Sequence, residues 1–305
     1  MRGSGRGLRE RGYFRPSRHR NERNQPVTPA PILRVGHSPD PDDAFMFCAL
    51  AKGAVRIRDY QVEHVLEDIE SLNDRALAGE LPITAISAHA YLSVADRYWI
   101  MATGASMGEG YGPVVVSRKA GSLEDLAGRR VAIPGPRTTA ALLARCYIGE
   151  FEPVVVPFDQ IFETVEAGRA EAGVVIHEGQ LTYEARGFHL LSDFGVRFED
   201  EHGLPLPLGL DVVRRDLGRD LAIEVNRAMR ASIDWAYANE DEALDYALLF
   251  GRGLERELGR KFVKMYVSAL TRDMGDSGEA ALRALFTMAE RAGVVSEAPD
   301  FELIR

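Results

Sequence analysis

The chain has only two cysteines in 305 residues, Cys48 and Cys146, and neither belongs to a CxxC pair or has a histidine nearby. Their scarcity argues against a disulfide framework, and no metal site is legible in the sequence. No stretch reaches the roughly 18 apolar residues of a membrane span. The first residues also lack the apolar segment of a secretion signal. These absences predict a cytoplasmic protein with neither a metal nor a membrane partner.

Net positive charge is confined to the N-terminus. The net charge is −9, yet residues 1–24 hold eight arginines against two glutamates, a net +6, which leaves −15 for the remainder. Such an acidic remainder argues against a broad nucleic-acid surface on the folded part. Residues 1–31 are rich in Gly, Arg, Ser and Pro, so we expect a disordered basic arm. Contact of this arm with RNA stays open.

Motifs for nucleotides and for serine hydrolases are missing as well. Three glycines lie within residues 108–117, but no helix start follows them, so they form neither a Walker loop nor a dinucleotide fingerprint. A flexible crossing between two lobes fits this segment better. Ser87 has no GxSxG elbow around it, which argues against a hydrolase nucleophile. No cofactor is predicted.

What is present is an alternation of strands and helices over most of the chain. Hydrophobic runs and periodicity predict a first series of elements within residues 33–97 and a second within residues 114–176. In the first series, strands at 33–36, 62–66 and 83–87 alternate with helices at 44–51 and 69–78 and a helical stretch up to Arg97. In the second, strands at 114–116, 130–133, 154–156 and 174–176 alternate with helices at 138–147 and 161–167. This rhythm predicts parallel sheets with crossover helices.

A return strand at residues 208–213 and a mostly helical tail from Leu221 complete the pattern, and residues 234–250 are its clearest amphipathic segment. We therefore expect two α/β lobes, with residues 32–115 and 209–305 in lobe 1 and residues 116–208 in lobe 2. A cleft between lobes is a favoured place for a small-molecule site.

The strongest candidate for chemistry follows a buried strand. Small and β-branched residues at 173–176 are followed at once by His177 and Glu178. Ligands gather at the carboxyl ends of strands in α/β proteins, and a histidine there is suited to proton transfer. A structural histidine at a strand end remains the alternative. On a continuing strand, Glu178 would face away from His177.

Two further segments combine polar groups with strand ends. In residues 37–47 (HSPDPDDAFMF), Pro39 and Pro41 hold the backbone extended, and Asp42 or Asp43 could cap a helix beginning near Ala44. Both a functional turn and a merely well-capped one fit this motif.

The second segment, residues 134–143 (PGPRTTAALL), opens a helix with Thr138 and Thr139. A helix N-terminus with two hydroxyls suits a carboxylate, although simple capping by one threonine is the alternative. Ser87, at the end of its strand, could likewise reach a ligand or cap the next helix.

Taken together, six segments in this order resemble the 1,4-dihydroxy-6-naphthoate synthase family of menaquinone biosynthesis by the futalosine route. They are residues 37–47 (HSPDPDDAFMF), 83–87 (ITAIS), 111–117 (YGPVVVS), 134–143 (PGPRTTAALL), 175–183 (VIHEGQLTY) and 204–209 (LPLPLG). The resemblance implies a fold like that of type II periplasmic binding proteins, with two lobes around a cleft and a helical C-terminal tail.

The resemblance also implies a cofactor-free lyase that converts cyclic dehypoxanthine futalosine to 1,4-dihydroxy-6-naphthoate and releases dihydroxyacetone. The catalytic histidine of the family falls on His177, as the general base. Its substrate-binding positions fall on two segments of this chain and, as further candidates, on the first motif. They are Ala85, Ile86, Ser87, Thr138, Thr139, Ser38 and Asp42.

Two departures from the family leave the exact substrate open. Asp42 stands where the family often has Asn, and Ala85 where a polar or basic residue is common. A chorismate dehydratase-like enzyme is one alternative, although its usual Tyr-Leu-Asn run is absent. A non-catalytic solute-binding protein of the same fold is another, although no secretion signal or lipid-anchor cysteine is found in residues 1–31. Nothing in the sequence indicates an oligomeric state.

Overall fold

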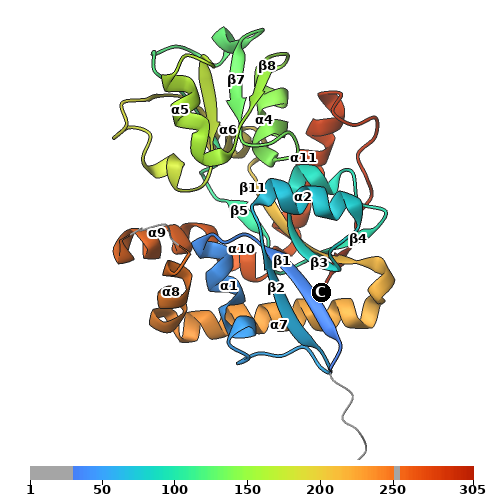
Figure 1. The fold of residues 1–305 in the computed structure, drawn as a ribbon. Coiled ribbons are helices and arrows are strands. Elements are labelled where there is room, and N and C mark those ends of the chain that lie inside the picture. The colour runs from blue at the N-terminus through green and yellow to red at the C-terminus, as the bar shows by residue number, and fades with distance from the viewer. Residues whose placement is uncertain (1–29, 251–254) are drawn as a thin grey trace, which may run out of the picture. The chain divides into compact units, whose positions relative to one another are not determined.

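Two β-sheets, each flanked by helices, organise the chain (Figure 1). The computed structural model describes residues 30–250 and 255–305, and all the elements below belong to one unit, Pro31–Arg305. Apart from residues 30 and 31, the predicted basic arm lies outside the described residues. The strands of the larger sheet, in order across it, are β12 (Leu303–Ile304), β4 (Tyr98–Met101), β11 (Leu206–Arg214), β3 (Ile83–Ser87), β1 (Ile32–His37) and β2 (Gln61–Leu66), with β5 (Ser106–Gly108) paired to β11.

The smaller sheet takes its strands from the middle of the chain. Its order is β10 (His189–Asp193), β6 (Val114–Ser117), β9 (Ala172–Val175), β7 (Arg130–Ile133) and β8 (Glu152–Val155). The chain thus leaves the larger sheet after β5 and returns to it at β11. This course agrees with the two predicted lobes, whose limits at residues 115 and 208 stay a prediction.

Helices cover both faces of each sheet. In the described residues they are α1 (Pro41–Ala51), α2 (Ile69–Ala78), α3 (Ala88–Tyr91), α4 (Thr139–Ile148), α5 (Ile161–Glu166), α6 (Phe194–His202), α7 (Arg219–Ala238), α8 (Glu240–Leu248), α9 (Arg256–Tyr266), α10 (Ala269–Arg272) and α11 (Gly275–Arg291). Helix α1 packs on α7, α8 and α9, and α5 packs on β7 and β9. None of the helices in the described part of the chain has both the length and the apolarity that crossing a membrane requires.

The prediction of parallel sheets is right only in part. Strand β1 runs parallel to β2 and β3, and β7 runs parallel to β8 and β9. Strand β11, however, is antiparallel to β3 and β4, and β6 is antiparallel to β9 and β10. These antiparallel strands are the ones by which the chain passes between the two sheets, so both sheets are mixed.

Several predicted elements need correction. The helical stretch up to Arg97 contains only the four-residue α3 (Ala88–Tyr91), and β4 follows it. The predicted amphipathic segment 234–250 is two helices, α7 and α8, separated at Asn239. The segment at residues 189–202, which had no predicted element, forms β10 and α6. Short or mixed-polarity segments of this kind carry too weak a periodicity to be recognised.

Helix α2 shows why one predicted boundary is sharp. Asp68 occupies its N-cap, and the carboxylate accepts hydrogen bonds from the backbone N–H groups of Glu70 and Ser71, both at 3.1 Å. Gly79 ends the helix in the left-handed conformation.

We expect Asp68→Ala to lower the free energy of unfolding by about 1 kcal/mol, measured by urea denaturation, because the N–H groups of Glu70 and Ser71 lose their acceptor. Asp68→Asn, which keeps an acceptor, should lose less.

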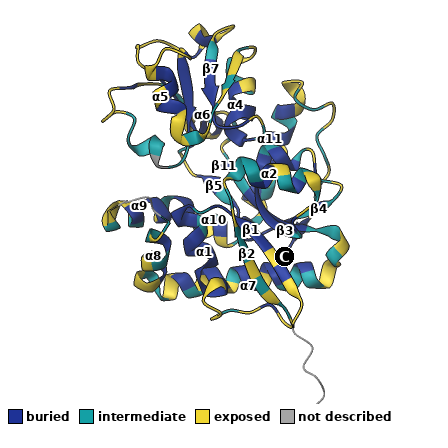
Figure 2. Ribbon diagram, viewed as in Figure 1, coloured by how far each residue is buried: buried dark blue, intermediate teal, exposed yellow. Residues whose placement is uncertain are grey.

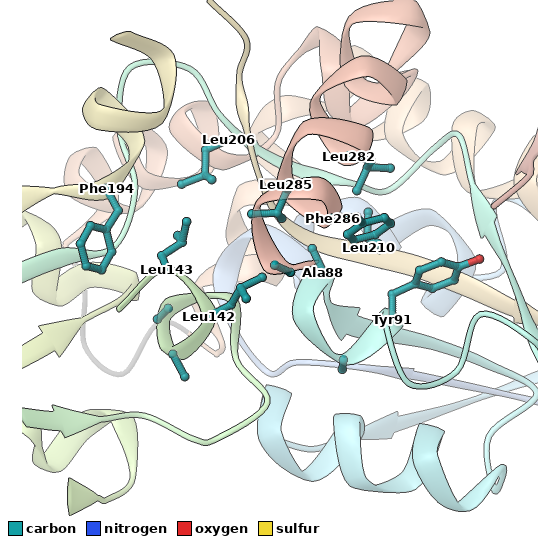
Figure 3. Close-up of a cluster of buried hydrophobic side chains, with 14 of the residues drawn as sticks. Ala88, Tyr91, Leu142, Leu143, Phe194, Leu206, Leu210, Leu282, Leu285 and Phe286 are labelled. Carbon is teal, nitrogen blue, oxygen red and sulfur yellow. The ribbon is translucent and has the colours of Figure 1, made fainter. Parts of the chain in front are cut away.

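One apolar core connects the two sheets. Helices α4 and α11 and strand β11 bury Leu142, Leu285 and Leu206 in a single cluster that reaches from β3 to β7 (Figure 3). The inner strands β3, β6 and β9 are buried, whereas the edge strands β2, β8 and β10 are partly exposed. Figure 2 shows many of the exposed residues on the outer helices and loops. The two sheets are therefore held together by packed side chains as well as by the chain crossings.

Candidate active site

A pocket lies between the ends of the strands of the two sheets. Its empty space, counted together with open solvent, is about 740 Å³. All eight residues that the sequence assigned to the site line this one pocket: Ser38, Asp42, Ala85, Ile86, Ser87, Thr138, Thr139 and His177. The structure thus brings together segments that are up to 139 positions apart, counted from Ser38 to His177. Their roles remain predictions.

His177 sits at a sharp turn of the backbone. Strand β9 ends at Val175, Ile176 is extended, and a short 3₁₀ helix runs over His177–Leu181. His177 itself has a φ of +56°, which is uncommon for a residue other than glycine. The strand does not continue through Glu178, so the expectation that this residue faces away from His177 by strand alternation has no basis. The Glu178 side chain lies outside what the structure describes. Strained backbone of this kind clusters at functional sites.

The imidazole of His177 is largely buried and lies beside Asp40 and Phe158. Its Nδ1 lies 3.6 Å from Oδ2 of Asp40, at the start of α1. The ring of Phe158 packs edge-on against it, with ring centroids 4.8 Å apart. The histidine is thus held from two sides, and it still lines the pocket.

The turn after β1 differs from the predicted one. Helix α1 begins at Pro41 rather than near Ala44, and the residue at the N-cap is Asp40, not Asp42 or Asp43. The carboxylate of Asp43 accepts a hydrogen bond from the Ser38 N–H at 2.7 Å. Asp43 therefore ties the turn together, and Ser38 and Asp42 both reach the pocket.

His37 supports this turn from behind. Its Nδ1 lies 3.0 Å from the Ser38 carbonyl oxygen, its Nε2 lies 2.9 Å from Nδ1 of His64, and its ring stacks on Phe47 at 4.2 Å. Burial, together with the nearby His64, lowers the pKa of His37 to about 3. A neutral His37 that donates from Nδ1 holds the Ser38 carbonyl in place, and Ser38 lines the pocket.

Carboxyl groups dominate the electrostatics of the pocket. Burial raises the pKa of Asp42 well above its ordinary value, and the neighbouring Asp43 and Asp40 raise it further. Burial likewise raises the pKa of Asp43 to about 6, against the lowering effect of its bond to Ser38. Among the described residues that line the pocket there is no lysine or arginine. The buried Oδ1 of Asp42 has no hydrogen-bond partner, so this carboxyl can offer a proton to a ligand.

This carboxyl should make stability depend on pH. The folded state keeps a proton on Asp42 that the unfolded chain releases near its ordinary pKa, so stability falls as the pH rises above that value. We expect Asp42→Asn to raise the free energy of unfolding, and to raise it more at pH 8 than at pH 5, in urea denaturation. The exposed Asp300, replaced by Asn, serves as the control. An equal gain at both pH values would contradict the assignment.

The threonine pair opens α4 as predicted. Thr138 is the N-cap: its hydroxyl accepts from the Ala141 N–H at 3.2 Å and donates to the Gly135 carbonyl at 2.8 Å. The Thr139 hydroxyl donates to the Leu208 carbonyl of β11 at 2.6 Å. Both hydroxyls thus have partners within the protein. The helix N-terminus, with its dipole, remains the feature that favours an anion here.

Ser87 does not cap the helix that follows it, although that was the simpler reading of the sequence. It occupies the N-cap of α3, but its side chain makes no capping bond. Its hydroxyl accepts instead from the Asn73 amide at 3.1 Å, and its N–H donates to the Asn73 oxygen at 2.8 Å. Asn73 therefore holds the end of β3 against α2, with Ser87 lining the pocket.

Some lining residues had no signal in the sequence. Tyr266 comes from α9 in the helical tail, and its hydroxyl accepts a hydrogen bond from the Gln180 amide at 2.8 Å. Burial raises the pKa of Tyr266 well above its ordinary value. Gly104 and Ser106 reach the pocket from the segment around β5. Of these four residues, Gln180 lies in a segment that the sequence analysis singled out, three residues after His177. Within the described residues, no group of three or more His, Cys, Asp and Glu side chains is arranged to hold a metal ion.

Comparison with protein families identifies the chain. The family model described as menaquinone biosynthesis matches residues 33–291, most of the chain. The chain belongs to the menaquinone biosynthesis family. The resemblance noted in the sequence is thereby confirmed.

Two curated proteins are similar to this chain over most of its length. A 1,4-dihydroxy-6-naphthoate synthase of Thermus thermophilus is 43% identical over 267 residues, which cover 88% of this chain and 97% of that protein. A protein of the same name from Streptomyces coelicolor is 35% identical over 272 residues, covering 87% of this chain and 95% of that protein. The alignment with both relatives thus extends over nearly the whole of each.

Solved structures agree with the fold of this menaquinone biosynthesis family member. The crystal structure of a protein from Archaeoglobus fulgidus has a TM-score of 0.82 and 47% identity, and the match covers 87% of this chain and 98% of that one. The alkanesulfonate-binding protein SsuA of Xanthomonas axonopodis has a TM-score of 0.63 at 12% identity, covering 90% of this chain and 96% of that one. The second likeness shows the fold alone. The fold is that of periplasmic binding proteins, as expected.

Proposed function

We propose that this protein is a lyase that converts cyclic dehypoxanthine futalosine to 1,4-dihydroxy-6-naphthoate and dihydroxyacetone in menaquinone biosynthesis. The observation that carries the proposal is the placement of His177 on the wall of a pocket lined by the matching family segments. The identity of 43% to the Thermus thermophilus synthase, over nearly its full length, supports the same reaction.

In this proposal His177 acts as the general base. It takes a proton from the substrate, and bond cleavage then releases the three-carbon fragment as the aromatic naphthalene ring forms. Ile69, Leu208 and Leu210 supply apolar walls suited to a flat ring system. The N-terminus of α4 faces an oxygen-rich, anionic part of the substrate.

The other predicted site residues would then contact the substrate. The end of β3, at Ala85, Ile86 and Ser87, would lie along one edge of it, and Ser38 and Asp42 along another. A small residue at Ala85 leaves room at that edge. The carboxyl of Asp42, whose Oδ1 has no hydrogen-bond partner, would donate a hydrogen bond to a substrate oxygen.

A direct assay tests this function. The purified protein is incubated with cyclic dehypoxanthine futalosine, and products are followed by liquid chromatography with mass detection. We expect 1,4-dihydroxy-6-naphthoate and dihydroxyacetone in equal amounts. Tight binding without turnover would instead indicate a solute-binding protein, and loss of water from chorismate in a parallel incubation would indicate a chorismate dehydratase-like enzyme.

A further inference from the structure

We propose that Asp40 is the positioning residue of His177. In this arrangement the Asp40 carboxylate accepts the Nδ1–H of the imidazole, which leaves Nε2 unprotonated and turned toward the substrate. The two residues come from different sheets: Asp40 follows β1 of the larger sheet, and His177 follows β9 of the smaller one. The catalytic consequence of this inference rests on the proposed function, whereas the pairing itself does not.

The geometry of the pair supports this role. Nδ1 of His177 and Oδ2 of Asp40 are 3.6 Å apart, and their side chains are only 18% and 7% exposed. This distance is longer than a hydrogen bond, and a movement of under about 1 Å would close it. Catalytic hydrogen bonds are often long without substrate and tighten in the Michaelis complex.

The behaviour of Asp40 at the start of α1 is a second, independent observation. Aspartate is among the best N-cap residues, because its carboxylate can accept from the first free N–H groups of a helix. Asp68 caps α2 in this way, and Asp193 caps α6. Asp40 stands at the same position of α1, with extended backbone, yet its side chain does not cap the helix. Its carboxylate lies beside His177 instead.

The backbone around Asp40 holds this carboxylate in place. Asp40 lies between Pro39 and Pro41, which restrict the backbone on both sides, and its N–H donates to the Ser38 hydroxyl at 3.2 Å. Little conformational freedom is therefore left to lose when it pairs with the imidazole. Asp43, the other nearby carboxylate, is already bonded to the Ser38 N–H.

The imidazole is held in a matching way. The backbone of His177 is left-handed, the ring of Phe158 packs against the imidazole, and Nδ1 is the ring nitrogen that lies beside Asp40. A carboxylate on Nδ1 selects the tautomer in which Nε2 is the base, and it stabilises the imidazolium that forms. The substrate proton moves to Nε2, the Nδ1 proton stays on nitrogen, and none passes to Asp40.

The pairing can be tested without substrate. Long-range ¹H–¹⁵N NMR of the full chain reports the tautomer of each histidine, and the His177 signals are assigned by their absence in His177→Gln. We expect the Nδ1–H tautomer in the parent and a shift toward the Nε2–H tautomer in Asp40→Ala. Asp68→Asn, an N-cap aspartate that does cap its helix, should leave the parent pattern unchanged. An Nε2–H tautomer in the parent, or no change in Asp40→Ala, would overturn the proposal.

Kinetics then separate positioning from binding. With cyclic dehypoxanthine futalosine as substrate, we expect Asp40→Ala to lower kcat about 10²-fold with little change in KM, because the base is misoriented while the pocket remains. A raised KM with unchanged kcat would show that Asp40 only binds substrate, and the proposal would be wrong. A parent without turnover would refute the proposed function, yet the tautomer measurement would still decide the pairing.

Discussion

His177→Ala is expected to lower kcat on cyclic dehypoxanthine futalosine by about 10²–10⁴-fold, the range that a single general base contributes. Binding should persist, because the apolar walls and the α4 N-terminus remain in place. Steady-state kinetics give the loss in kcat, and calorimetric titration of the variant with substrate gives the affinity.

The control for this substitution is His189→Ala, since His189 lies exposed on β10, away from the pocket. It should keep the activity of the parent. If His177→Ala turned over substrate at the rate of the parent, the histidine would be structural, and the alternative left open by the sequence would be correct. If the variant lost binding as well as turnover, the main contribution of the His177 side chain would be to substrate affinity.

Gly195→Ala is expected to cost about 3 kcal/mol of the free energy of unfolding. A Cβ on Gly195, in the first turn of α6, would lie 1.9 Å from the backbone carbonyl of Tyr111, and backbone atoms cannot rotate away. Helix propensity favours alanine over glycine, but only by roughly 0.5–1 kcal/mol. The steric overlap therefore outweighs the gain in helix propensity, and the substitution destabilises the protein. Urea denaturation of parent and variant measures the difference.

Gly121→Ala is the matched control, because its nearest neighbour would be the Asp125 carboxylate at 3.3 Å, the end of a side chain that can move. Its effect should stay within about 0.5 kcal/mol. A stable Gly195→Ala variant would mean that the segment 109–113 shifts readily. The sequence suggested such a flexible crossing, whereas the structure packs Gly112 against Gly195 and anchors the Tyr111 hydroxyl to the Met265 carbonyl at 2.6 Å.

The elements that the sequence predicts best have strong local signals. The predicted and observed limits of helix α2 agree at both ends, because a capping aspartate precedes its periodic apolar residues and a left-handed glycine follows them. Strand β3 is a short apolar run that ends at Ser87. The direction of β6 and β11 depends instead on which strand each finds as a partner. That choice is made by tertiary packing, and no periodicity within the strand records it.

The same division holds for the site. Strand ends and helix starts are visible in the sequence, and they placed His177, Thr138 and Ser87 on one pocket. Tyr266 reaches the pocket only because α9 packs on α1. The contact between Asp40 and His177 depends on a left-handed turn at a residue other than glycine, which a strand pattern does not predict.

The apolar cluster shared by the two sheets limits how a molecule can enter the pocket. Swinging the smaller sheet away as a rigid body would hydrate Leu142, Leu206 and Leu285, all of them fully buried. At about 1.5–3 kcal/mol for each leucine, exposing all three would cost roughly 5 kcal/mol or more. Fewer than about one protein molecule in a thousand would then be in the open state at any moment. We therefore expect substrate entry and product release to depend on movements of the loops around the pocket. Substitutions in these loops should change the rates of entry and release more than substitutions where the chain crosses between the sheets.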